Sequence, residues 1–199
     1  MKKAILLIIV SGLWHKAPAQ AAGCAGEYMY LGADQPFTLV PVVYYQTARN
    51  WYIEGRYNYE AVKTMSVYAG KVFQKKSAVS YSGGPVAGIV LGRFTGGSAG
   101  VNAEVDYKKL LFSSQFQYTF SIHDKTENFF YSWSDLSFAL SDNIYSGISV
   151  QQTNLYHVKF RLEKGLFVKI LLNKWSFPFY VFNPAAQQRY FVLGMTRDW

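Results

Sequence analysis

The sequence predicts an all-β protein, a closed antiparallel transmembrane β-barrel, from three observations. Apolar and polar residues alternate along stretches of about ten residues, the length of a strand that crosses a bilayer at a tilt. Aromatic residues make up 18% of the 199 residues, and 16 glycines accompany them, a composition typical of strands, tight turns and interfacial girdles. No apolar run after residue 20 is long enough for a membrane helix.

The clearest alternation lies in residues 98–123. Because side chains along a strand point to opposite faces with period two, this stretch predicts two strands, each with one apolar and one polar face. The apolar face has small residues in the first strand and large ones in the second: Ala99, Val101, Ala103, Val105 and Tyr107, then Leu110, Phe112, Phe116, Tyr118, Phe120 and Ile122. We expect a short turn near Lys108 and Lys109, and we expect the apolar face to meet lipid.

Residues 1–19 predict a cleaved secretory signal peptide. Lys2 and Lys3 form its charged start, residues 4–13 its apolar core, and Ala17-Pro18-Ala19 a cleavage site of small residues before Gln20. We expect an N-terminal segment at 20–35, including a short strand candidate at 27–31, and a barrel at 36–199.

Cys24 is the only cysteine in the chain. It follows Ala22 and Gly23, which resembles the end of a lipoprotein signal, although it lies well beyond the apolar core; acylation of Cys24 stays open. A single cysteine cannot form an intramolecular disulfide, so the fold does not depend on one.

Strand candidates follow one another from residue 37 to the end of the sequence. In order they are 37–46, 51–60, 64–74, 86–94, the two strands of 98–123, 129–141, 144–155, 158–163 running into the apolar stretch 165–172, 175–182, and 189–199. Residues 75–84 are expected to be a connector. Phe129, Phe130, Tyr131 and Trp133 are interpreted as an interfacial girdle. Eleven candidates become twelve with 27–31, or ten if two segments between 155 and 172 form one strand; we expect twelve, since bacterial barrels have even numbers.

The net charge of +8 does not indicate a nucleic-acid-binding protein. Three of the 20 Lys and Arg residues lie in the leader, which leaves 17 basic against 12 acidic residues scattered through strands and turns. Nucleic-acid binding requires a basic patch or stripe, which the sequence lacks.

The polar faces of the strands predict the side chains that line the interior. These are Glu54, Arg56, Asn102, Glu104, Asp106, Gln115, Gln117, Lys159 and Arg161. Charges inside a narrow barrel are costly unless paired, which favours a charge-paired lumen and a structural or binding role. The alternative is a narrow channel for small polar solutes or ions, in which the same charges bias which ions pass.

Catalysis has little support in the sequence. His123 and Asp124 lie at an expected loop, where a barrel hydrolase could use them as base and acid, but any strand end can carry such a pair. No spacing of His, Cys, Asp and Glu indicates a metal site. Gly83-Gly84 and Gly96-Gly97 are interpreted as turns rather than phosphate-binding loops, so no cofactor is expected.

The end of the sequence resembles the assembly signal of Gram-negative outer-membrane barrels. Gly194 and Trp199 stand at matching positions, whereas Val192 and Arg197 depart from the pattern. Residues 175–194, with SFPFYVFNP and RYFVLG, look like the C-terminal hairpin of small uncharacterised outer-membrane barrel proteins. The resemblance implies an outer-membrane location, with membrane lipid and the barrel assembly machinery as partners. It carries over no catalytic residue, and any solute or protein partner stays open.

Overall fold

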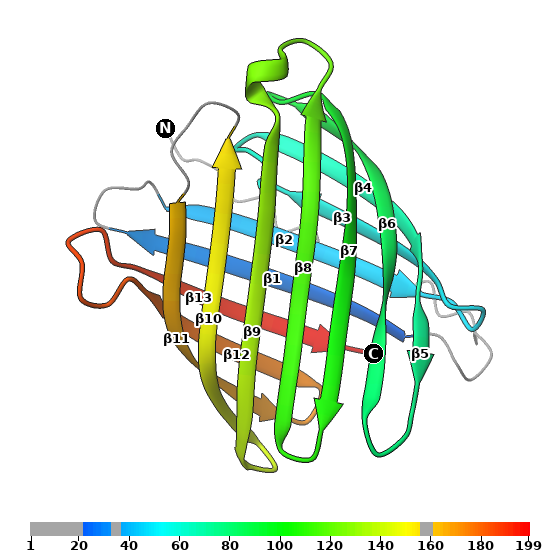
Figure 1. The fold of residues 1–199 in the computed structure, drawn as a ribbon, viewed down its shortest axis with the longest axis vertical. Helices are drawn as coiled ribbons and strands as arrows, with labels where there is room; N and C mark the ends of the chain where they lie inside the picture. The colour runs from blue at the N-terminus through cyan, green and yellow to red at the C-terminus, as the bar shows by residue number, and fades with distance from the viewer. Residues whose placement is uncertain (1–21, 33–36, 156–160) are drawn as a thin grey trace, which may run out of the picture.

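The computed structural model describes residues 22–32, 37–155 and 161–199 as one antiparallel sheet rolled into a barrel (Figure 1). Its strands are β1 (Ala22–Gly32), β2 (Thr38–Gln46), β3 (Trp51–Tyr57), β4 (Thr64–Lys71), β5 (Phe73–Lys75), β6 (Ser80–Gly92), β7 (Gly96–Tyr107), β8 (Leu110–Ser121), β9 (Phe129–Ser141), β10 (Ile144–Leu155), β11 (Arg161–Leu172), β12 (Trp175–Phe182) and β13 (Tyr190–Asp198). A short 3-10 helix, η1 (Lys125–Glu127), follows β8. In the described ranges no helix is long and apolar enough to cross a membrane.

The barrel closes through β4, which pairs with β3 on one side and with β6 on the other. β5 continues the ladder of β4 along β6 in the same register, since Gly70 pairs with Val86 and Phe73 pairs with Gly83. The barrel therefore has twelve strands, with β5 as an extension of β4. The predicted closed antiparallel barrel of twelve strands is confirmed.

β1 and β11 decide the strand number. The short candidate at 27–31 is part of a full-length β1, which pairs with β2 and with β13. β10 and β11 are separate strands, paired from Ile144 with Ile170 to Thr153 with Arg161, so the ten-strand alternative is wrong. The predicted signal peptide at 1–19 and the residues 156–160 lie outside the described part of the chain.

The expected connector at 75–84 is wrong, because β6 already begins at Ser80. The two glycine pairs interpreted as turns lie inside β6 and β7. A Cβ atom on Gly84 would collide with the carbonyl oxygen of Lys71, and one on Gly97 would collide with the ring of Phe120. These glycines allow close approach between neighbouring strands.

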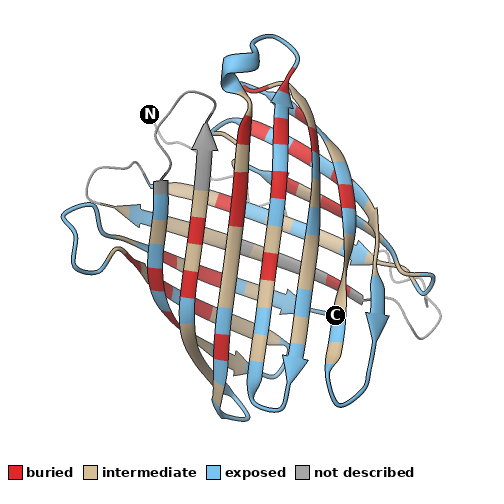
Figure 2. Cartoon of the chain, in the orientation of Figure 1, coloured by how far each residue is buried: buried red, intermediate tan, exposed pale blue. Residues whose placement is uncertain are grey.

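Exposed and buried residues alternate along the strands, as expected when one face of each strand points outward and the other into the barrel (Figure 2). On the outer face Val101, Phe112 and Phe116 have exposed fractions of 47%, 39% and 45%. On the opposite face of β8, Gln117 and Thr119 are 2% and 0% exposed. Large apolar side chains are exposed and polar side chains are buried, which is the reverse of the arrangement in a soluble domain. This is the arrangement expected of strands surrounded by lipid.

The two ends of the barrel differ in their connections. At one end, which we call the turn end, two-residue turns at 108–109, 142–143 and 173–174 lie beside the start of β1 and the end of β13. Lys108 and Asn173 have φ values of 58° and 56°, as such hairpin turns require. The other end, the loop end, has longer connections at 58–63, 122–128 and 183–189.

Candidate functional site

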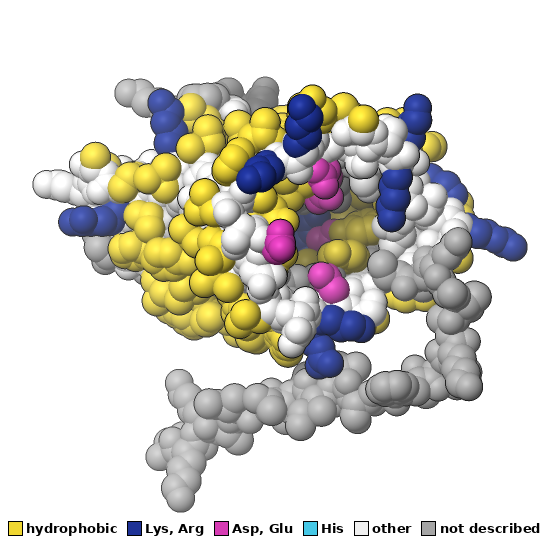
Figure 3. Space-filling view, turned by 90° about the horizontal axis from the view of Figure 1, so that it is seen from below, with side chains coloured by type: hydrophobic (Ala, Val, Ile, Leu, Met, Phe, Trp, Pro, Cys, Tyr) yellow, Lys and Arg dark blue, Asp and Glu magenta, His cyan; other side chains and the backbone are white. Residues whose placement is uncertain are grey.

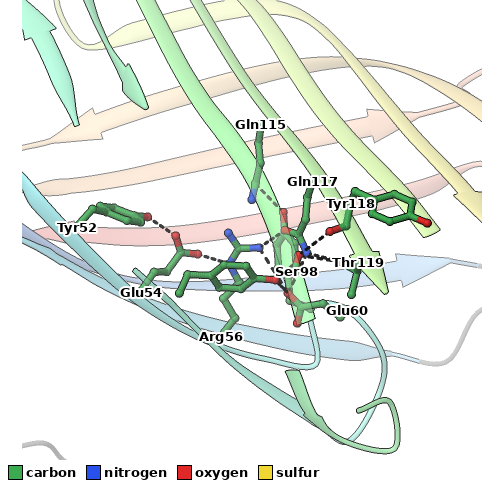
Figure 4. Close-up of polar contacts among 11 residues, drawn as sticks. Tyr52, Glu54, Arg56, Glu60, Ser98, Gln115, Gln117, Tyr118 and Thr119 are labelled. Carbon is green, nitrogen blue, oxygen red and sulfur yellow. Dashed lines mark hydrogen bonds and ion pairs between the residues drawn. The ribbon is translucent and has the colours of Figure 1, made fainter. Parts of the chain in front are cut away.

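Arg56 stands at the centre of a polar cluster that spans the barrel interior (Figure 4). Alternation along β3 turns Arg56 and Glu54 to the same face, where they are 3% and 5% exposed. The Nε of Arg56 donates to Glu54, and its Nη1 donates to Gln117 Oε1 on β8 at 2.8 Å. β3 and β8 are not neighbours in the sheet, so this hydrogen bond crosses the lumen.

The connection between β3 and β4, residues 58–63, folds into the lumen. Asn58 closes this loop at φ 59°, with its Oδ1 accepting from the Lys63 backbone N–H at 2.7 Å. The side chain of Glu60 is 0% exposed, and its Oε1 lies 3.6 Å from Arg56 Nη1. The ring of Tyr59 meets the Tyr131 ring edge-on, with centroids 5.6 Å apart. The loop thus reaches from β3 across the barrel to β9.

Gln115 and Gln117 complete the cluster from β8. With its amide oxygen toward Arg56, Gln115 accepts from both terminal nitrogens at 3.1 and 2.6 Å and donates to the Tyr59 hydroxyl at 2.9 Å, which satisfies both neighbours. Gln117 Nε2 donates to the Tyr68 hydroxyl at 2.8 Å. Four of the predicted interior residues, Glu54, Arg56, Gln115 and Gln117, therefore meet at one site.

Two groups of buried, mostly aromatic side chains lie in the interior beyond this cluster, toward the loop end. One group joins Val90, Phe94, Phe129 and Tyr131, with Tyr59 and Ala61 of the in-folded loop packed against it. A second joins Phe167, Tyr180, Phe182 and Val192, with Trp133 and Tyr190 against it. Phe129 and Tyr131 are 8% and 9% exposed, so the interpretation of Phe129, Tyr131 and Trp133 as an interfacial girdle is wrong.

A cavity of about 490 Å³ occupies the interior on the turn side of Tyr59. Its wall includes Glu54, Asn102, Glu104 and Asp135 together with the rings of Tyr28, Tyr44, Tyr52, Trp133 and Tyr180. Viewed from the turn end, the barrel is hollowed, with acidic side chains inside the opening (Figure 3). Polar side chains of the predicted set, Asn102 and Glu104, thus belong to an open part of the interior.

Asp135 is a fixed carboxylate in the cavity wall. Trp133 Nε1 and Ser149 Oγ donate to its Oδ1 at 2.8 and 2.6 Å, and the Tyr180 hydroxyl donates to Oδ2 at 2.9 Å. Asp135, and Tyr59 and Glu60 of the loop, are interior residues that the sequence did not predict. Trp133 and Asp135 are two residues apart in one strand and therefore share a face. A charged residue on that face is the signal that would have predicted an inward position for both.

The remaining predicted residues lie apart from the central cluster. Asp106 is exposed near the turn end of β7, where it pairs with Ser80 in the register of β6. Arg161 begins β11, and Lys159 lies outside the described residues. Gly194 is in β13, and the half-exposed Trp199 follows that strand.

His123 and Asp124 lie in the exposed loop before η1. The Asp124 carboxylate caps η1 by accepting from the Thr126 backbone N–H at 2.8 Å, and this hydrogen bond lowers the pKa of Asp124. Asp124 therefore has a local structural partner. Within the described ranges, no group of three or more His, Cys, Asp or Glu side chains is arranged to hold a metal ion.

No protein-family model and no curated protein matches the sequence. The solved structures that are similar in fold include three structures of porins. A structure described as "KdgM porin" has a TM-score of 0.66 at 9% identity, covering 87% of this chain and 98% of its own. A structure described as "KdgM porin in complex with disordered oligogalacturonate" has a TM-score of 0.63 at 10% identity, and the match covers 88% of this chain and 98% of that one. A structure of NanC porin has a TM-score of 0.61 at 8% identity, and the match covers 86% of this chain and 97% of that one. These proteins are porins rather than enzymes, and the chain has the fold of a porin-type outer-membrane β-barrel.

Proposed function

We propose that the protein lies in the outer membrane of a Gram-negative bacterium and acts as a narrow channel for small polar solutes or ions. The porin fold and the apolar outer face support the location. The cavity that opens at the turn end and reaches the polar centre of the barrel carries the channel function. A purely structural role needs no such space, so the channel is favoured over the structural or binding role.

The in-folded loop is the constriction of this channel. Tyr59 lines the cavity and also packs against the aromatic group of Val90, Phe94, Phe129 and Tyr131. It therefore stands between the cavity and the aromatic groups at the loop end. The guanidinium of Arg56 lies 4.3 Å from the centre of the Tyr59 ring, which holds the ring in this position.

Truncating Tyr59 is expected to enlarge the channel. Tyr59→Ala removes the ring at the constriction, so the unit conductance of the purified protein in planar lipid bilayers should rise above that of the wild type. Tyr107→Ala is the matched control, because Tyr107 is 41% exposed and lies at the turn end of β7, away from the constriction.

The outcomes of this experiment separate the functions. Steps of current in the wild type that grow in Tyr59→Ala and not in Tyr107→Ala support the channel and its constriction. If neither the wild type nor Tyr59→Ala conducts while both remain folded, the channel function is wrong. The structural or binding role is then favoured.

The C-terminal segment has a proposed role of its own, as the signal that the barrel assembly machinery recognises. Trp199 is 52% exposed, and its backbone N–H donates to the Gly23 carbonyl at 3.1 Å. Trp199→Ala should therefore cost less stability in micelles than the roughly 1.5–3 kcal/mol of a fully buried apolar side chain. Its level in the outer membrane of cells should nevertheless fall sharply. Trp51→Ala, which truncates a 55% exposed tryptophan, should reach wild-type levels; equal levels for both variants would contradict the signal.

A further inference from the structure

We propose that the channel prefers cations, and that Glu104 and Asp135 in the cavity set this preference. The inference rests on the proposed channel function and goes beyond it by naming the class of solute. It follows from the balance of charge among the interior side chains that the structure describes, which is opposite in sign to the +8 of the whole chain.

Carboxylates outnumber cations among the interior side chains that the structure describes. The acidic groups with contacts or cavity positions inside include Glu54, Glu60, Glu104 and Asp135, and the basic ones are Arg56 and Lys169. Lys71 also borders the cavity, but its ammonium donates to the Arg49 carbonyl and lies 5.0 Å from the Trp51 ring, at the exposed outer rim.

Neither interior cation makes the cavity wall positive. Arg56 lies between Glu54 and Glu60, so two carboxylates offset its charge. Lys169 extends from β11 over the Tyr145 ring, with its ammonium 5.0 Å from the ring centre, and it makes no ion pair within 4 Å among the described residues. Glu104 and Asp135 line the cavity and Lys169 does not, so the charge that the cavity wall presents beside Arg56 and its two carboxylates is negative.

The shape and the lining of the cavity strengthen the preference for cations. Walls of low dielectric constant concentrate the field of charges placed inside a cleft. Figure 3 shows acidic side chains within the opening and Lys and Arg side chains around its outside. Tyr28, Tyr44, Tyr52, Trp133 and Tyr180 also line the cavity, and the faces of such rings attract cations, organic ammonium ions included. The solute class that this interior fits is small cations.

The reversal potential across a planar bilayer with a potassium chloride gradient measures the preference directly. The reversal potential of the wild type should have the sign that indicates a higher permeability to potassium than to chloride. Glu104→Gln should shift this potential toward zero, and Glu104→Lys should shift it further. Glu127→Gln is the matched control: it also removes one carboxylate, but from the exposed η1, and should give the wild-type value. The heat-dependent electrophoretic mobility of folded barrels shows whether each variant is folded.

The result also separates this inference from the channel function. If a conducting wild type has a reversal potential of zero or of the sign for chloride, the cation preference is wrong and the channel stands. Equal shifts in Glu104→Gln and Glu127→Gln would show that Glu104 does not set the preference. If no folded form conducts, the channel function fails, and the cation preference fails with it.

Discussion

Replacing Arg56 with methionine is expected to lower the free energy of unfolding by about 3–5 kcal/mol, because it leaves buried carboxylates without their cation. Glu54 is 5% exposed and the side chain of Glu60 is 0% exposed, so water compensates only a small part of the lost guanidinium. Methionine keeps most of the side-chain volume, which separates the loss of charge from the creation of a cavity. Urea titration of the barrel refolded in micelles measures the change.

A compensated variant tests the physical reason for this loss. If the cost comes from unpaired carboxylates, Glu54→Gln and Glu60→Gln added to Arg56→Met should recover most of the stability, since neutral amides are less costly to bury than charges. Recovery in the triple variant supports the ion-pair account. An Arg56→Met protein that unfolds at the wild-type urea concentration would show that the cluster does not stabilise the barrel.

The barrel could be predicted from the sequence because alternation encodes both faces of each strand. In β7 and β8, Val101 and Phe112 alternate with Asn102 and Ser113, and no tertiary information is needed to place them on opposite faces. The length of β1 was underestimated because only residues 28–31 carry a continuous apolar and aromatic signal, while Ala22, Gly23 and Gly26 have little strand preference of their own.

The start of β9 was misinterpreted because aromatic residues on both faces hide the period of two. Phe130 contacts the Phe116 ring, with centroids 6.3 Å apart, whereas Phe129 and Tyr131 on either side of it are buried. A run of consecutive aromatics is compatible with an interfacial girdle or with an aromatic interior. Only the polar partners of the inward face, such as Asp135 for Trp133, distinguish the two.

The in-folded loop could not be predicted from local pattern. Residues up to Glu60 continue the alternation of β3, which is why the sequence favours a strand as far as residue 60. The chain leaves the strand after Tyr57, and the contacts that fix the loop join Tyr59 to Gln115 and Glu60 to Gln117, 56 and 57 residues away. Such long-range contacts leave no periodic signal in the loop itself.

Placing arginine at Val101 or at Asn102 tests the assignment of the two faces at adjacent positions of one strand. Val101 is 47% exposed on the outer face, and Asn102 lines the cavity. A charge on the lipid face near the bilayer midplane costs roughly 2–4 kcal/mol, whereas an arginine in the cavity meets water and the carboxylates nearby. Val101→Arg should therefore lower the stability in lipid vesicles by that amount, and Asn102→Arg should leave it close to the wild-type value.

The same pair carries its own control, because both variants add an identical side chain to β7. A general intolerance of arginine in the strand would destabilise both variants equally and would contradict the assignment. In detergent, which adapts its shape to the protein more readily than a bilayer does, the penalty at Val101 should shrink. A loss that is as large in micelles as in vesicles would mean that Val101 is intolerant for reasons of strand packing, and that its outward position does not place it in lipid.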